Sequence, residues 1–473
     1  MSVDFQDFVK ATVKKSDIPI VSTSKIQYPS GFMWLDYGAG SYLYVKDEDE
    51  VPLYTYHNVG IRQGSVNVIV AKSQGGKTTL AMKIAASIME PYLSQMIYDK
   101  IMKRGGQDRV DVSPENIGYP LIQILDTEKT LPLDYAKKVC QYTNKLVKQH
   151  VIINPITTDR DLMACLNQHI EYKVHNMKKI PMPMPDIFGR PILDYPPTFL
   201  IIDSMSQVLM EDVDAPDAKK TAKSKDVIDV YEDSIQNTAG ARRAKIISAL
   251  YSQLVNLADR YNIVIFSINH INKLLPVNGM PVKQYRGLRA GETIGGGERA
   301  IFLATSILRL DVIKNVSPNG STSVNLGDNT FGHIAIASWI KSKSNSKSNA
   351  SQLIYTNENG YDPLLSNLWM AKEEKILGEA GRFFYIPGYE EHKFTMKTYP
   401  EVFAANPKLF RALYYLCQDR CVKYLDDPDR AEKRNNELMQ KIRKDIREDL
   451  SSGDMKRTDA MDMDDLFASM IND

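Results

Sequence analysis

The segment Ala71–Thr78, AKSQGGKT, combines the residue types that bind the phosphates of a nucleotide. It lies between an apolar stretch and a helical one, the context in which such a loop is credible. Backbone N–H groups and the helix dipole would favour an anion there. Lys77 is expected to neutralise the β- and γ-phosphates, and the Thr78 hydroxyl to ligate Mg²⁺. The predicted nucleotide-binding residues of this segment are Ser73, Gln74, Gly75, Gly76, Lys77, Thr78 and Thr79.

Carboxylates end two further apolar stretches. Asp203 ends FLIID, and a carboxylate after four apolar residues can hold a water in the Mg²⁺ shell. Asp126 and Glu128 follow LIQIL, and a carboxylate beside the γ-phosphate can orient and deprotonate the attacking water. We assign Glu128 the role of catalytic base. The plainer interpretation of these acids is an ordinary strand end or turn.

Apolar stretches alternate with helical ones through the first 270 residues. The expected strands are Gly64–Val70, Tyr119–Leu125, Phe199–Asp203 and Asn262–Asn269. The expected helices are Thr78–Met89, Pro132–Gln149, Asp159–His175 and Thr238–Tyr261. This alternation predicts an α/β fold with a mostly parallel sheet and helices on both faces. Ligands of such sheets bind at the carboxyl ends of the strands, where the phosphate loop and the acids are expected.

Three segments interrupt this alternation, and another precedes it. Residues 36–60 contain Gly and acids and look loop-like, and Ile180–Pro197 carries six prolines and cannot be a helix. Asp212–Ser234 is polar and charged, and Lys273–Gly297 is Gly-rich and basic. Because the last two directly follow predicted strands, we expect them to emerge at the ligand-binding edge.

Composition describes an ordinary globular chain. It has 473 residues, 43% of them apolar and 25% charged, and no apolar run approaches the ~18 residues of a membrane span. The N-terminus has no apolar signal core, so we expect no membrane partner and a cytoplasmic location. The net charge of +1 does not by itself indicate a nucleic-acid partner. The cysteines fit a reducing compartment, and we expect the last two to pack within a helix: Cys140, Cys165, Cys417 and Cys421.

Further motifs follow in a defined order. SGFMWLDYGAGS precedes the phosphate loop, IIDSM contains Asp203, IFSINHIN contains Asn269-His270, and WIKSKS carries Lys341 and Lys343. Together these segments resemble the RecA family of DNA strand-exchange recombinases over roughly residues 25–400. Asn269-His270 and the run Gly295-Gly296-Gly297 make the chain most similar to the phage UvsX-type members. The Pro-rich segment, the long first loop and residues after 410 depart from the family.

The resemblance implies a RecA-like P-loop NTPase core and roles for single residues. Tyr135 would pack on the adenine, and His270 would report the phosphate state to the DNA site. Lys341 and Lys343 would reach across a filament interface to a neighbour's γ-phosphate. With Lys77 and Glu128 these form the predicted catalytic set. The implied organisation is an N-terminal oligomerisation segment (1–35), the ATPase core (36–400), a helical C-terminal extension (401–453) and an acidic tail (454–473).

The family's two DNA-binding loops would lie near residues 210–240 and 271–297. Cations track the phosphates of a single strand, and an aromatic ring can stack on its bases. The predicted DNA-binding residues are Lys219, Lys220, Lys223, Lys225, Arg243, Lys283, Tyr285, Arg286, Arg289, Gly295, Gly296 and Gly297.

The implied activity is that of an ATP-dependent recombinase with ATP and Mg²⁺ as cofactors. It would form helical filaments of its own copies on single-stranded DNA and pair them with homologous duplex DNA, in recombination and repair. A single-strand-binding or mediator protein is a further candidate partner. Two alternatives stay open: a replicative helicase on the same core, and a recombination mediator that uses ATP only as an assembly switch.

Overall fold

A computed structural model describes residues 25–46, 52–93, 117–140, 147–185, 191–210, 228–273, 288–289, 291–294, 301–316, 332–347 and 349–427, with only the backbone of residues 228–244. The chain divides into two units, Met1–Asp426 and Asp427–Asp473, and the fold below is that of the first. Residues 1–24 of the predicted N-terminal oligomerisation segment, the end of the C-terminal extension and the acidic tail lie outside the described residues.

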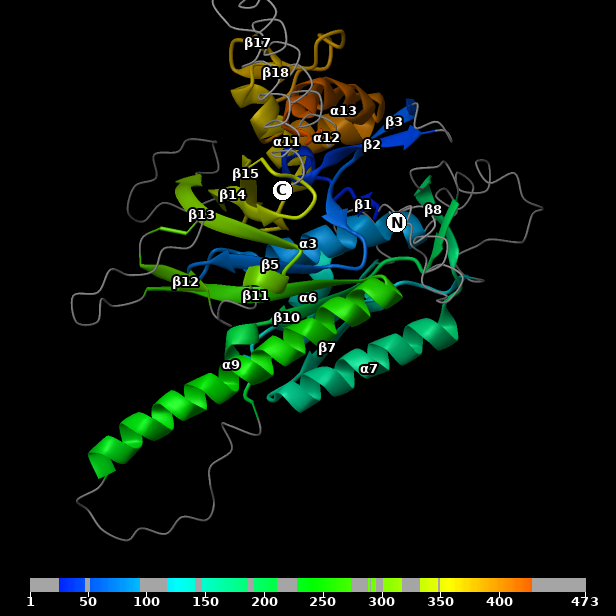
Figure 1. The fold of residues 1–473 in the computed structure, drawn as a ribbon. Coiled ribbons are helices and arrows are strands. Elements are labelled where there is room, and N and C mark those ends of the chain that lie inside the picture. The colour runs from blue at the N-terminus through cyan, green and yellow to red at the C-terminus, as the bar shows by residue number, and fades with distance from the viewer. Residues whose placement is uncertain are drawn as a thin grey trace, which may run out of the picture. The chain divides into compact units, whose positions relative to one another are not determined.

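A mixed sheet of ten strands forms the centre of the described fold (Figure 1). In spatial order its main path runs β16 (Gly360–Tyr361), β15 (Ala350–Thr356), β14 (Gly332–Ser342), β13 (Ser306–Val316), β5 (Val66–Ala71), β11 (Ile263–Lys273), β10 (Thr198–Asp203), β6 (Ile122–Asp126) and β7 (Val151–Pro155). The strands from β13 to β7 pair in parallel, and those from β13 to β16 pair antiparallel. A short strand, β12 (Glu292–Ile294), pairs antiparallel with the end of β11.

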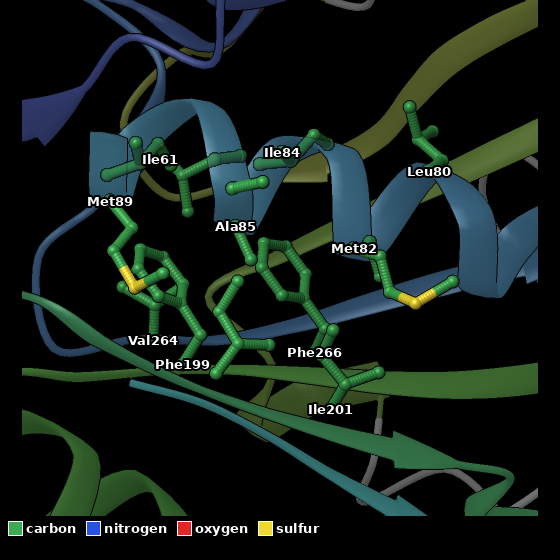
Figure 2. Close-up of a cluster of buried hydrophobic side chains, with 14 of the residues drawn as sticks. Ile61, Leu80, Met82, Ile84, Ala85, Met89, Phe199, Ile201, Val264 and Phe266 are labelled. Atoms are coloured by element: carbon green, nitrogen blue, oxygen red, sulfur yellow. The ribbon is translucent and has the colours of Figure 1, made fainter. Parts of the chain in front are cut away.

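Helices cover both faces of the parallel part, as predicted. The helices α3 (Lys77–Met89) and α6 (Leu133–Cys140) belong to one apolar layer, and α7 (Asp159–Asn176) and α9 (Ile228–Tyr261) to the other. Alternate residues of each strand pack in the two apolar layers, because successive side chains of a strand point to opposite faces of the sheet. In Figure 2 the side chains of α3 lie over those of β10 and β11, among them Ala85, Phe199, Ile201, Val264 and Phe266.

The four predicted strands are present as β5, β6, β10 and β11, but several other expectations need correction. Residues 36–60 are not a loop, since they contain α2 (Met33–Ala39), β2 (Ser41–Lys46) and β3 (Pro52–Asn58). The glycines around Gly40 suggested a loop, yet Leu43 and Val45 are buried by the hairpin. Of the helix expected over 132–149, the described residues show α6 (Leu133–Cys140) and then a 3₁₀ turn at Val147–His150 in place of an α-helix.

The helix expected from Thr238 begins instead at Ile228, so the second half of the segment predicted as a first DNA-binding loop is helical. Its amino-terminal half projects past the sheet (Figure 1). The Pro-rich insertion is a hairpin of β8 (Ile180–Pro185) and β9 (Pro191–Asp194), in agreement with the prediction that it is not a helix.

A second apolar cluster joins the C-terminal helices to α2. The helices α11 (Pro363–Glu373), α12 (Tyr399–Ala405) and α13 (Lys408–Cys421) contribute to it, and Cys417 and Cys421 are buried on α13. The cysteine pair therefore packs within a helix, as expected. The remaining pairs are β1 (Gln27–Tyr28) with β4 (Ile61–Arg62), and β17 (Gly378–Ala380) with β18 (Phe383–Tyr385). Among the helices that can be described, no candidate membrane span is found.

Candidate nucleotide-binding site

A pocket lies where β5, β6, β10 and β11 end at the same edge of the sheet. Its volume is about 180 Å³, and part of it is open to solvent. Each of its described lining residues was predicted from the sequence: Gln74, Gly75, Gly76, Lys77, Thr78, Thr79, Glu128, Asp203 and His270. Ser73 is exposed on the same loop.

The backbone of the phosphate loop depends on its glycines. Gly76 has φ +70° just before α3, and a Cβ there would lie 2.8 Å from Cε2 of Tyr361. A Cβ on Gly75 would lie 2.9 Å from the Cβ of Ala71. Ala71 itself ends β5 in extended conformation, which alanine adopts freely. The departure from the usual first glycine is therefore accommodated, and it makes Gly75 indispensable.

Lys77 is buried and points back across the loop. Its Nζ donates to the carbonyl of Lys72 at 3.0 Å and lies 3.5 Å from Nδ1 of His270. Burial lowers the pKa of Lys77, and the carboxylates of Asp203 and Glu128 oppose that shift. An anionic ligand in the pocket would stabilise the charged ammonium further.

Thr78 and Asp203 are in direct contact, because the Thr78 hydroxyl donates to Oδ2 of Asp203 at 2.6 Å. Burial raises the pKa of Asp203, against the opposing effect of that hydrogen bond. A divalent cation would relieve this penalty. Within the described residues no group of three His, Cys, Asp or Glu could hold a metal. The hydroxyl–carboxylate pair nevertheless fits Mg²⁺, which takes one or two protein ligands and completes its shell with water and phosphate oxygens.

The geometry separates the roles of Asp126 and Glu128. Asp126 is buried, and its carboxylate accepts hydrogen bonds from the backbone N–H of Glu128, Lys129 and Leu131. It therefore builds the turn and is not available to a water. Glu128 lines the pocket with a side chain 44% exposed, which leaves its carboxylate free to meet a ligand. Of the two acids, Glu128 is therefore the one that lines the pocket.

His270 lies between Lys77 and Glu128 of the pocket. Its Nε2 is 3.8 Å from Oε1 of Glu128, and its Nδ1 faces Lys77. It pairs in register with Ala71, the residue before the phosphate loop. The strand β11 then continues from His270 to Lys273 beyond the sheet edge.

Three tyrosines lie beside the phosphate loop, and only Tyr135 was predicted from the sequence. Tyr135 is half-exposed, and its hydroxyl lies 3.1 Å from Oγ1 of Thr79. Tyr361 is fully buried and donates to the carbonyl of Gly75 at 3.0 Å. Tyr355 packs against Tyr361, with ring centroids 5.3 Å apart. The sequence around Gly360 marks a turn, but only the return of β15 and β16 to α3 brings these tyrosines to the loop.

Lys341 and Lys343 lie away from the pocket of their own chain. Lys341 is at the end of β14, level with Val68 of β5 through Ile307, and so near the amino-terminal edge of these strands. Its Nζ donates to the carbonyls of Ile301 and Phe302. Neither lysine is among the residues that line the described pocket of its own chain.

The predicted DNA-binding residues fall mostly outside the described residues: Lys219, Lys220, Lys223, Lys225, Lys283, Tyr285, Arg286, Gly295, Gly296 and Gly297. Arg243 lies on α9, in the part of which only the backbone is described. Arg289 is exposed, with Nη2 3.6 Å from Oδ2 of Asp311.

Compared with known proteins, the chain matches no family model and no curated protein.

Proposed function

We propose that this protein is an ATP-hydrolysing recombinase with a RecA-like core, which forms filaments on single-stranded DNA and exchanges strands with a homologous duplex. The observation that carries the proposal is the meeting of Lys77, Glu128 and His270 in one pocket, at the end of the strand that feeds the predicted second DNA-binding loop. The motif order that resembles the RecA family supports the same function.

The hydrolytic step would follow from the positions of the pocket residues. Glu128 takes a proton from a water whose oxygen bonds to the γ-phosphorus, while the bond to the β–γ bridging oxygen breaks and ADP leaves. Lys77 and the backbone amides of the loop stabilise the charge that develops on the phosphate oxygens. Mg²⁺, held by Thr78 and Asp203, would neutralise the β- and γ-phosphate oxygens.

His270 would couple the nucleotide pocket to the second predicted DNA-binding loop. The imidazole is within reach of both Lys77 and Glu128, and the same strand leads directly into Lys273–Gly297. A change in charge at the γ-phosphate would alter the contacts of His270, and so the position of the strand that continues from it. This is a coupling between two sites through one shared element.

A strand-exchange assay tests the proposal. Wild-type protein, ATP and Mg²⁺ are mixed with circular single-stranded DNA and a homologous linear duplex, and joint molecules are counted. We expect joint molecules with the wild type and with Lys397→Arg, an exposed lysine far from the pocket in sequence, and none with Lys77→Ala. Unwinding of a forked duplex without strand exchange would instead identify a helicase.

A further inference from the structure

A buried ion pair joins β12 to β13 beside the phosphate loop. Nη1 and Nη2 of Arg309 donate to the two carboxylate oxygens of Glu292, at 2.5 and 3.2 Å. Nε and Nη2 of Arg309 also donate to Asp311, at 2.7 and 3.1 Å. Arg309 and Glu292 are each only 4% exposed. Such doubly bidentate contacts have a fixed geometry, because the guanidinium and both carboxylates are planar.

The Arg309–Glu292 pair links β12 to the strand that leads into the phosphate loop. Arg309 pairs in register with Val70, and on the other side of β5 the same Val70 pairs with Asn269, next to His270. Three residue pairs, Ile271–Ile294 to Lys273–Glu292, then attach β12 to the end of β11. The strand of the phosphate loop is thus joined to β12 twice, through β11 and through Arg309.

A small apolar cluster fills the space beside the ion pair. Val68 and Val70 of β5 pack in it with Leu288, which precedes β12, and with Ile294, the last residue of β12. Ala304 and Ile307 also belong to it. The cluster is separate from the two layers that hold α3 and α9. The phosphate-loop strand and the residues that flank β12 therefore share apolar packing, in addition to the indirect links through β11 and Arg309.

We propose that Arg309 and Glu292 are positioning residues, which clamp β12 and the extension of β11 beyond His270 to the strand of the phosphate loop. This inference rests on the proposed function and names the element through which the nucleotide pocket acts on the second predicted DNA-binding segment. Arg309 does not bind a phosphate itself, since carboxylates occupy both edges of its guanidinium.

The clamp makes a specific prediction for nucleotide-induced ordering. A non-hydrolysable ATP analogue in the pocket should slow amide hydrogen exchange in Ile271–Lys273 and Glu292–Ile294 of the wild type by at least about threefold. In Glu292→Gln this slowing should disappear, although the analogue binds with an affinity within about threefold of the wild type, since Glu292 does not line the pocket. Arg309→Lys, which keeps the charge but not the paired contacts, should be intermediate.

Controls separate this inference from general destabilisation. Glu374→Gln breaks the exposed ion pair with Lys423 and should leave the exchange pattern as in the wild type. If Glu292→Gln fails to fold, the double variant Arg309→Met/Glu292→Leu replaces the buried pair by apolar residues, a change that proteins often tolerate. It should bind the analogue and also lack the slowing.

The outcomes are distinct. Full slowing in Glu292→Gln, or in the double variant, would overturn the clamp. So would a wild type that binds the analogue and shows no slowing in β12. A wild type that does not bind the analogue at all would refute the proposed function, and the clamp with it, and the binding measurement alone would show this.

Discussion

The two ends of the parallel strands each hold a lysine and a histidine, in opposite settings. At the carboxyl ends, Lys77 and His270 line an open pocket with Glu128. At the amino ends, Lys173 and His169 of α7 are buried under the sheet. There Nζ of Lys173 donates to the hydroxyl of Thr198 at 3.0 Å and to a backbone carbonyl at 2.6 Å, and both ring nitrogens of His169 have partners.

The two ends differ in which polar side chains are left accessible to a ligand. Polar groups of the buried end satisfy one another, so burying them is tolerated and they hold α7 to the strands. In the pocket, Glu128 keeps an exposed carboxylate and Lys77 faces carbonyls and an imidazole. The same residue types are therefore structural at one edge of the sheet and line an open pocket at the other.

The largest effect that this comparison predicts is on hydrolysis. Glu128→Gln should lower the rate of phosphate release about 10²–10⁴-fold with ATP binding retained, because it removes the base and keeps the shape. The matched control is Glu391→Gln, which removes an acid that also lies within 4 Å of a histidine, His392, but does not line the pocket. A Glu128→Gln protein that binds ATP and hydrolyses it at the wild-type rate would remove Glu128 from the mechanism.

The same substitution at the two lysines should give opposite results. Lys77→Met should lower hydrolysis by about 10²–10³-fold, because a charged donor to the phosphates is lost. Its free energy of unfolding should fall less than that of Lys173→Met, because the Lys72 carbonyl that loses a donor is only part-buried and can accept from water.

Lys173→Met should instead cost about 1–3 kcal/mol of unfolding free energy, because the carbonyl of Asn262 loses a buried partner. Its activity per folded molecule should not change. Denaturant titrations and single-turnover hydrolysis measure both quantities. If Lys173→Met abolished hydrolysis in folded protein, the structural assignment of the buried cluster would be wrong.

The buried histidine also predicts a pH dependence of stability. Burial, together with the charge of nearby Lys173, lowers the pKa of His169 to about 3. In the unfolded chain this histidine has an ordinary pKa near 6.5. Between pH 6.5 and pH 3 the unfolded state therefore binds more protons than the folded state, so the free energy of unfolding falls as the pH drops through this interval.

At pH 5 the cost of this group should be about 2 kcal/mol relative to pH 7. His169→Gln should reduce the slope of unfolding free energy against pH over this interval, measured by urea titration. An unchanged slope would show that other groups cause the acid sensitivity.

The smallest expected effect concerns Tyr361, which the sequence did not single out. Tyr361→Phe removes one hydrogen bond to the carbonyl of Gly75 and should weaken ATP binding about two- to tenfold. Tyr385→Phe on the β17–β18 hairpin is the control. Equal affinities of the two variants would show that Tyr361 does not shape the loop.

The pocket was predictable from sequence because each of its parts is a short motif at the end of one predicted strand. The phosphate loop is contiguous, and Asp203 and Glu128 follow buried strands whose parallel pairing brings their ends together. The position of Tyr361 was not predictable, since it depends on the antiparallel return of β13–β16 to α3. The Arg309–Glu292 pair joins residues of two strands whose pairing partners the sequence does not specify.

The most direct test of the account is steady-state phosphate release from ATP and Mg²⁺, measured with and without single-stranded DNA. We predict that the wild type releases phosphate, that single strands raise the rate, and that Glu128→Gln abolishes both the basal and the stimulated release. A wild-type protein that binds ATP but shows no release under either condition would contradict the catalytic assignment, and release indifferent to single strands would contradict the recombinase.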